Sequence, residues 1–350
     1  MIPILYEKDE TEFQSEGIGR LADCTKCIVT EERNGTYECE FSYPVSGPLF
    51  TEIKEDRIIF ADHDDSGQGQ PFIIYARSEP IDEVVTFNAH HLSYRLSNEV
   101  VTPIRATTVA GALEQIKTNA VGGTAFTFWT DKDTTAVYQL KVPALIRSVL
   151  GGEEDSLLAT FGDGEYEFDK FAVKLWGRRG HDTDVEVRYG KNMVDYTHTL
   201  DVSETYDAVL PYWFQEGSET EPSEIVIGDM IRHNGGTKAV PLDLSDHFEE
   251  KPTKSELMGA AVTTFDSSRP WIPQEEFEID FAALWQTEEF KEYAPFQRLK
   301  LCDTVLVYFL DYGVEAIREK VVKTVYNVLL DRYDEIVLNT LPATFSGIIG

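Results

Sequence analysis

The chain has 350 residues, of which 42% are hydrophobic and 27% are charged, a composition typical of a folded protein and not of a disordered acidic one. Its 62 Asp and Glu residues outnumber its 31 Lys and Arg residues, so the formal net charge is −31 at pH 7. Because such a surface repels phosphates at long range, specific nucleic-acid binding is not expected.

The N-terminal sequence MIPILYEKDETEF has no basic segment followed by an apolar run, so no secretory signal is predicted. No stretch reaches the roughly 18 apolar residues of a membrane span, and we expect the chain to fold in a cytoplasm. Cys24, Cys27, Cys39 and Cys302 form no disulfide framework. A zinc site that combines the first three with His63 lacks a second CxxC or a paired HxxxH, so no metal is predicted.

Residues 1–103 show the pattern of short strands. Two extended runs in residues 27–44 flank Asn34-Gly35, a dipeptide that favours a tight hairpin turn. Further strands are predicted at 56–62, 71–80 and 83–96. Several strands spaced by turns, with no helical period, predict a small β-barrel or sandwich.

Residues 104–165 mix helical and strand patterns. Val109, Leu113, Ile116 and Ala120 recur at helical spacing, which predicts a helix that ends at Gly122-Gly123. A strand follows at 124–131, and a second helix is predicted to begin at Pro143 and to end before Gly151. The segment is therefore expected to be a small α/β module.

The strand pattern returns at 166–215 and at 298–345. Between these two segments, residues 216–297 are acidic, interrupted by Pro and weakly periodic, which predicts an insertion of loops and short helices. The order along the chain is thus β, α/β and interrupted β, a β-rich α+β protein.

The stretch VKLWGRRGHDTDVEVRYGKNM, residues 173–193, combines glycines with basic residues. A phosphate-binding loop places glycines between a strand and a helix N-terminus. Here the following DTDVEVRYG alternates as a strand does. We therefore predict a β-hairpin turn that carries exposed basic residues.

The seven histidines form no catalytic signature. His63-Asp64-Asp65 has the chemistry of a metal site or a general base, but it lies in a polar turn, where a solvated histidine is expected. His90 and His91 point to opposite faces of one strand, so one of them is expected to pack inward. HExxH and GxSxG are absent from the sequence, and no catalytic residue or cofactor is predicted. A carboxylate pair without a recognisable motif stays open as an alternative.

Four stretches resemble, in this order, the N-terminal region of the tail-associated proteins of siphophages and prophages, a family described as prophage endopeptidase tail or phage minor structural protein. They are TEERNGTYECEFSYPVSG (30–47), QPFIIYARSEPIDEVVTFNAHHLSYRLSN (70–98), YEFDKFAVKLWGRRGHDTDVEVRYGKNM (166–193) and RLKLCDTVLVYFLDYGVEAIREKVVKTVYNVLLDRYDEIVL (298–338).

The resemblance implies a fold like the central hub of contractile-tail baseplates. Each chain would hold two small β-barrels, one over 1–103 and a discontinuous one over 166–215 and 298–345, with the α/β module between them. Three chains would form a homotrimeric ring at the virion tail tip, assembled in the bacterial host cytoplasm. The ring would join the tail tube and distal tail protein to the host-adhesion or wall-penetrating apparatus, beside the tape-measure and receptor-binding proteins, and DNA would pass through it unbound.

The resemblance also sets the expectations for individual residues. Arg178, Arg179, Arg188 and Lys191 are candidates for pairing with acids on an adjacent subunit, and four exposed, solvated charges are the alternative. Where the family commonly has Gly before Asp-Thr, this chain has Cys302, which leaves the backbone angle at that position open.

Other functions stay open as alternatives. Family members that digest the cell wall do so through segments beyond the hub region, so no enzyme activity is expected in these residues. A peptidoglycan hydrolase with an unrecognised site remains an alternative. A carbohydrate-binding module is another, prompted by the five tryptophans, Trp129, Trp176, Trp213, Trp271 and Trp285.

Overall fold

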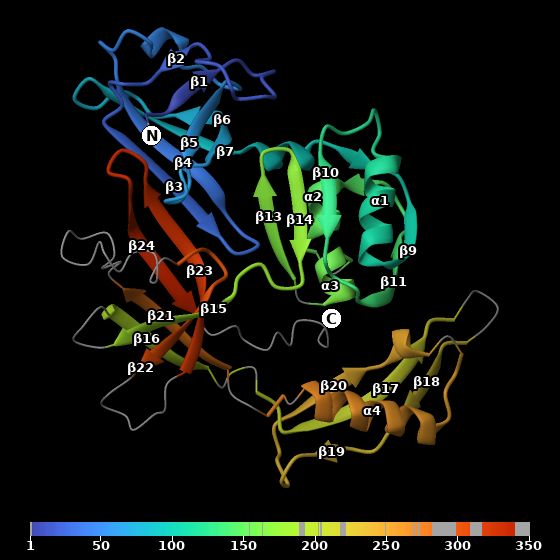
Figure 1. Ribbon diagram of the computed structural model, residues 1–350. Coiled ribbons are helices and arrows are strands. Elements are labelled where there is room, and N and C mark those ends of the chain that lie inside the picture. The colour runs from blue at the N-terminus through green and yellow to red at the C-terminus, as the bar shows by residue number, and fades with distance from the viewer. Residues whose placement is uncertain are drawn as a thin grey trace. The chain divides into compact units, whose positions relative to one another are not determined.

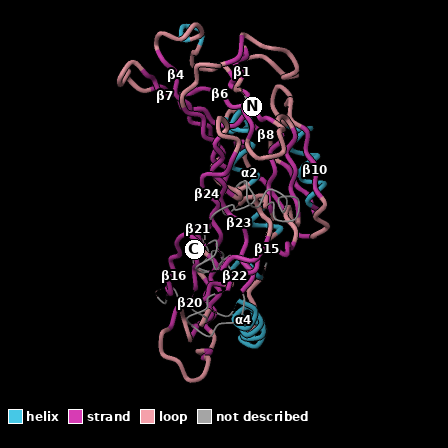
Figure 2. Tube along the Cα trace, turned by 60° about the vertical axis from the view of Figure 1, so that its left-hand side comes forward, coloured by secondary structure: helices cyan, strands magenta, loops and turns pink. Residues whose placement is uncertain are grey.

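The computed structural model describes residues 2–153, 155–162, 164–188, 193–201, 203, 205–217, 222–248, 250–268, 270–271, 274–281, 299–308 and 317–339. The chain divides into two compact units (Figure 1). The first comprises Met1–Tyr196 and Ile279–Asn339, and the second is built on Thr197–Glu278. Strands and loops make up most of the trace (Figure 2). None of the helices described is long and apolar enough to cross a membrane.

The N-terminal region is an antiparallel set of strands, as predicted. The strands are β1 (Ile4–Tyr6), β2 (Gly19–Arg20), β3 (Lys26–Glu32), β4 (Tyr37–Pro44), β5 (Ile58–Asp62), β6 (Gly69–Arg77) and β7 (Val84–His91), with 3-10 turns η1 (Phe50–Glu52) and η2 (Leu92–Ser97). They pair in the order β3-β4-β7-β6-β5-β1-β2. The predicted hairpin is confirmed, because β3 pairs with β4 and Asn34 has a φ of 55°.

The α/β module follows. It contains β8 (Val100–Val101), β9 (Ile104–Thr108), α1 (Val109–Asn119), β10 (Thr127–Thr130), β11 (Thr135–Leu140), β12 (Ala144–Leu145), α2 (Ile146–Leu150), α3 (Leu157–Phe161), β13 (Glu165–Asp169) and β14 (Ala172–Trp176). The first predicted helix is confirmed: Val109, Leu113 and Ile116 are buried on one face of α1. The second helix begins at Ile146 and not at Pro143, because Ala144 and Leu145 pair with β8.

One apolar core joins the module to the N-terminal strands. Ile4 and Phe60 belong to the same buried cluster as Ile116 of α1 and Phe161 of α3. The N-terminal strands and the helices of the module therefore share one apolar core, and both regions belong to the first unit.

The C-terminal strands continue the N-terminal sheet. They are β15 (Asp182–Arg188), β16 (Met193–Asp201), β21 (Gln274–Phe281), β22 (Thr304–Tyr308), β23 (Ile317–Asn327) and β24 (Arg332–Asn339). Strand β23 pairs with β24 on one side and with β3 on the other. A sheet of 13 strands results, with the path β16-β21-β24-β23-β3-β4-β7-β6-β5-β1-β2 and with β15 and β22 beside it.

The fold is β-rich with few helices, as expected, but no sheet of the described residues closes into a barrel. The physical reason lies at β23, whose second edge is occupied by β3 of the other β region. Two regions that were predicted as separate barrels therefore share one continuous sheet in the part of the chain described.

The second unit is a small sheet covered by a helix. Its elements are β17 (Ala208–Gln215), β18 (Glu224–Ile227), β19 (Ile231–Arg232), β20 (Ala239–Asp243), η3 (Ser245–His247) and α4 (Lys254–Ser268). Strand β17 pairs antiparallel with β18 and β19 and parallel with β20. The sequence pattern placed 208–215 with the C-terminal strands and predicted loops and short helices over 216–297. In the structure, β17 instead pairs with the strands immediately downstream of it, β18, β19 and β20.

The hydrogen bond that caps the N-terminus of helix α1 can be tested by substitution. Thr108 precedes the helix and its Oγ1 accepts a hydrogen bond from the Gly111 amide at 3.1 Å. Thr108→Ala should lower the free energy of unfolding by about 1 kcal/mol, because this amide loses its partner. Thr108→Ser retains the hydroxyl and should stay close to the wild type. Urea unfolding followed by circular dichroism measures both, and equal losses in the two variants would contradict the cap.

Candidate functional site

The glycine-rich loop Gly177–His181 connects two different sheets. Strand β14 before it pairs with β10 and β13, whereas β15 after it pairs in parallel with β22. The predicted β-hairpin is therefore wrong, since the flanking strands pair with segments distant in sequence. The predicted strand after the glycines is confirmed as β15, whereas a phosphate-binding loop is followed by a helix.

The loop packs closely against the turn before β22. A Cβ atom on Gly180 would overlap the carbonyl oxygen of Cys302. Cys302 has a φ of 74°, so the left-handed backbone angle is kept although the residue is not glycine. The buried carboxylate of Asp303 accepts hydrogen bonds from the His181 amide at 3.0 Å and from the Lys300 amide at 2.9 Å. His181 Nδ1 lies 2.9 Å from the same carboxylate.

Arg179 of this loop points into the protein. Its Nη1 donates to Oε1 of Glu31 at 2.8 Å, and the side chains are only 16% and 7% exposed. Burial alone lowers the pKa of Arg179, but the Glu31 carboxylate outweighs this effect and the pKa lies above its ordinary value. Loop and strand β3 are thus joined by a buried ion pair.

Glu165, at the start of β13, is the centre of a second buried network. Its side chain is 2% exposed; Arg33 Nε donates to it at 3.0 Å, the Arg179 amide at 2.6 Å, and Lys320 Nζ forms an ion pair with it. Burial raises the pKa of the carboxyl, but the bonds from Lys320 and Arg179 outweigh it, so the pKa is lowered. The β3–β4 turn, β13 and β23 meet at this one carboxylate.

The side-chain amide of Asn34 forms hydrogen bonds with the backbone beside Glu165. Its Nδ2 donates to the Gly164 carbonyl at 2.8 Å, and its Oδ1 accepts from the Tyr166 amide at 2.8 Å. The side chain therefore pairs with the start of β13 as a neighbouring strand would. Since Asn34 is also the turn residue of the first hairpin, one residue both turns the chain and joins it to the module.

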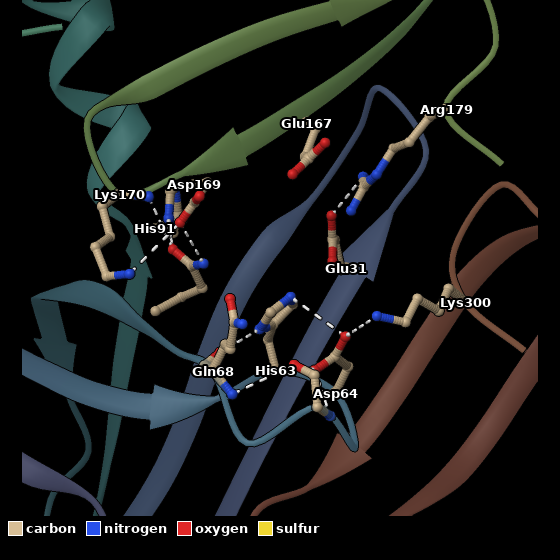
Figure 3. Close-up of polar contacts among 12 residues, drawn as sticks. Glu31, His63, Asp64, Gln68, His91, Glu167, Asp169, Lys170, Arg179 and Lys300 are labelled. Atoms are coloured by element: carbon tan, nitrogen blue, oxygen red, sulfur yellow. Dashed lines mark hydrogen bonds and ion pairs between the residues drawn. The ribbon is translucent and has the colours of Figure 1, made fainter. Parts of the chain in front are cut away.

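A polar cavity of about 300 Å³ opens at this junction (Figure 3). Its lining includes Glu31 and Arg179, the β5–β6 connection with His63 and Asp64, and Lys300. Asp64 Oδ2 lies 3.6 Å from Lys300 Nζ and 3.8 Å from His63 Nε2, and His63 Nδ1 lies 3.0 Å from the Gln68 carbonyl oxygen. The cavity therefore lies within the first unit, between its N-terminal strands, β13 and the C-terminal segment.

A buried histidine lies behind Gln70, which lines the cavity. His91 is fully buried and stacks on Tyr37 with 4.3 Å between ring centroids. Burial holds the pKa of His91 well below its usual value, so the ring is neutral at pH 7. Gln70 lies 3.4 Å from His91 Nε2 and donates to Asp169 Oδ1 at 3.1 Å. As expected, His91 packs inward while the adjacent His90 is only partly buried.

The four basic residues singled out from the sequence have different surroundings. Arg178 is half-exposed and pairs with Asp182, with Nη1 donating at 3.3 Å. Arg188 pairs with Glu186 at 2.9 Å and lies over the ring of Tyr308. Arg179 is buried against Glu31, and Lys191 lies outside the described residues. A role between subunits therefore stays a proposal and concerns chiefly Arg178 and Arg188.

Three residues of the junction were missed from the sequence: Glu31, Glu165 and Lys320. For Glu31 a signal existed, because the period of two in β3 places it on the same inward face as Cys27 and Val29. Glu165 lies 132 residues from Arg33 and 155 from Lys320, and no local pattern predicts such pairs.

The cysteines are buried, and Cys27 and Cys39 place their sulfur atoms 3.7 Å apart. In the part of the chain that the structure describes, no group of three His, Cys, Asp or Glu side chains has an arrangement suited to a metal. The carboxylates of the junction instead bind cations and amides of the same chain. Such an arrangement is suited to holding segments together.

No protein-family model matches the sequence, and neither does any curated protein. Solved structures are similar in fold. The prophage tail protein gp18 from Listeria monocytogenes EGD-e shares 13% identity, with 99% of this chain and 97% of that chain covered at a TM-score of 0.59. The 43 kDa tail protein of prophage MuSo2 from Shewanella oneidensis shares 12%, with 91% and 94% covered at 0.57. A tail protein from Neisseria meningitidis MC58 shares 8%, with 97% of each chain covered at 0.53. The β-rich fold of these tail proteins, which the sequence resemblance implied, is thereby confirmed for this chain, without the detail of two barrels.

The close packing of the loop predicts that alanine substitutions at two of its glycines change the free energy of unfolding by different amounts. Gly180→Ala should lower the free energy of unfolding by about 1–3 kcal/mol, because the added methyl group meets rigid backbone at Cys302. Gly177→Ala should change it by less than about 0.5 kcal/mol, because the nearest atom is 3.6 Å away on the flexible Lys132 side chain. Chemical unfolding of both variants is the measurement, and equal effects would contradict the packing.

Removing the charge of Glu165 should be costly. Glu165→Gln leaves Arg33 and Lys320 buried without a counter-charge, and we expect a loss of about 3 kcal/mol at pH 7. The control is Glu40→Gln in the exposed pair with Lys26, which should cost less than about 0.5 kcal/mol.

The same variant gives a pH test. The pKa of Glu165 is lower in the folded state than its ordinary value of 4.5, so its stabilising contribution is present above that pH and is lost as pH falls through the lower folded value. The difference in free energy of unfolding between the wild type and Glu165→Gln should therefore become smaller towards low pH. Unfolding curves between neutral and acidic pH measure it, and a constant difference would contradict an ionised Glu165.

Proposed function

We propose that this protein is a structural component of a phage or prophage tail, the hub at the tail tip, and that it acts as a homotrimeric ring. The observation that supports this most is the match of fold over nearly the whole chain to prophage tail proteins. In the proposed ring, the N-terminal strands and the C-terminal strands of three chains make a surface of pseudo-sixfold symmetry that docks the hexameric end of the tail tube.

The two small barrels belong to the same proposal. They are assigned to residues 1–103 and to 166–215 with 298–345, and among the described residues strands of both regions belong to one continuous sheet. The continuous pairing of β23 with β3 supports a fixed relation between the two regions. A ring that transmits a fixed symmetry from the tube to the apparatus below requires such rigid placement.

The proposed partners are the other two chains, the distal tail protein and tail tube, and the tape-measure and receptor-binding proteins. The formal charge of −31 supports passage of DNA through the ring without adhesion, since like charges repel. The proposed location is the tail tip of the virion, after assembly in the bacterial host cytoplasm.

We propose a role without catalysis. The carboxylates around the cavity are engaged by partners within the chain: Glu31 by Arg179, Asp303 by backbone amides, and Asp169 by Gln70. A hydrolase would release soluble fragments from purified peptidoglycan, and release by this chain that a single carboxylate substitution abolishes would overturn this part of the proposal.

The trimer is tested by the absolute mass of the purified chain in solution. Light scattering across a concentration series should give three times the chain mass, because the ring is proposed to form from identical subunits. A monomer at every concentration, also in the presence of the distal tail protein, would contradict the ring. Assembly only with that protein would show that the neighbour templates it.

Charge reversal tests the residues proposed to lie between subunits. Arg178→Glu combined with Arg188→Glu should shift the mass towards the monomer, because both side chains would repel acids of the adjacent subunit. Lys117→Glu, an exposed reversal on α1, is the matched control and should leave the mass unchanged. A trimer unaffected by the double reversal would exclude these arginines from the interface.

A further inference from the structure

The sheet of the second unit is covered on only one face by the residues described. On that face Trp213 of β17 and Val226 of β18 pack against Leu257 and Phe265 of α4. The strand period of two sends the neighbouring side chains to the opposite face. In Figure 1 the helix lies along one side of this sheet.

The opposite face is apolar and exposed. Phe214 lies directly across from Ile225, and Tyr212 from Ile227, so these four side chains share that face. Phe214, Ile225 and Ile227 are 43%, 55% and 51% exposed. Large apolar side chains gathered on one exposed face are typical of a surface that binds another molecule.

Strand β18 also has a free edge among the residues described. The Gly228 amide donates to the Pro211 carbonyl at 2.8 Å, and in an antiparallel ladder the residues bonded to the neighbour alternate. Val226 therefore bonds to β17, whereas the amides and carbonyls of Ile225 and Ile227 point away from it. The two residues with exposed apolar side chains thus also offer backbone groups for a further strand.

The surroundings of this edge are acidic. Residues 197–278 contain 17 Asp and Glu but only 5 Lys and Arg. The connection from β17 to β18, residues 216–223, contains three glutamates, and β18 itself begins with a fourth, Glu224. Glu216 is exposed and Glu224 pairs with Lys251. Pairing of two such edges from identical chains would bring these acids together, which disfavours a second copy as the occupant.

We propose that β18 is a docking edge for an extended segment of another protein in which apolar residues alternate with Lys or Arg. The apolar side chains of that segment pack on Phe214, Ile225 and Ile227, its backbone bonds to Ile225 and Ile227, and its basic side chains face the acids. This inference goes beyond the tail proposal and does not depend on the trimer.

The probe is a fluorescein-labelled peptide of about ten residues in which Val and Lys alternate, added to the full-length protein at about 0.15 M salt. Fluorescence anisotropy should show saturable binding. A peptide of identical composition with its Lys and Val residues in two blocks should bind at least about tenfold more weakly, because it cannot present one apolar face. Equal binding of the two peptides would show non-specific attraction to an acidic protein and overturn the proposal.

Two variants locate the site. Ile225→Lys places a charge on the apolar face, and Ile227→Pro removes an amide that points to the free edge while the bonds to β17 remain. Each should weaken binding at least about tenfold. Val137→Lys, an exposed valine of β11, is the matched control and should bind as the wild type does.

Folding of the variants is checked by circular dichroism and by thermal unfolding. If Ile227→Pro does not fold, methylation of alternate backbone nitrogens of the peptide replaces it, since this removes the same ladder of hydrogen bonds from the other partner. If the Ile225→Lys protein binds the alternating peptide as tightly as the wild type does, the proposal is overturned. The same holds if the methylated peptide binds the wild type as tightly as the unmethylated one.

Discussion

The ion pairs of the buried Glu165 carboxylate fix how three segments of the first unit are placed relative to one another. This carboxylate is the point where the turn after β3, the start of β13 and strand β23 meet, through Arg33, Lys320 and the amide of Arg179. Removing a carboxylate from water is unfavourable, and here two cations and an amide offset that cost. Any arrangement that separates the three segments leaves buried charges unpaired, so the network favours one relative placement.

The placement has structural consequences beyond the ion pairs. Because Lys320 and its neighbours are held beside the first hairpin, β23 can pair with β3, and strands from both ends of the chain become one sheet. The Glu31–Arg179 pair and the contact of Gly180 with Cys302 hold the connecting loop against this sheet. The loop's basic residues were predicted to pair with an adjacent subunit, but one of them, Arg179, pairs with Glu31 of the same chain.

Acids outnumber bases two to one, and several of the scarce cations lie at the junction, where they bind segments of the chain together. Several of these charged groups also line the polar cavity. In the second unit, the apolar face of β17 and β18 lies beside an edge of β18 that is free among the residues described, so exposed side chains and backbone groups occur there together.

The sequence by itself determined the features that depend on near neighbours. The Asn34-Gly35 turn, helix α1 and the alternating strands follow from φ preferences and from periods of 2 and 3.6 residues, which act within a few positions. Only the tertiary structure decided where strands paired across the chain. Strands β14 and β15 lie in different sheets, and Ala144 and Leu145, which were predicted to be helical, pair with β8. Glu165 is buried against residues more than a hundred positions away. Such contacts depend on the global pairing of strands, and local propensity carries no information about which distant edge a strand will meet.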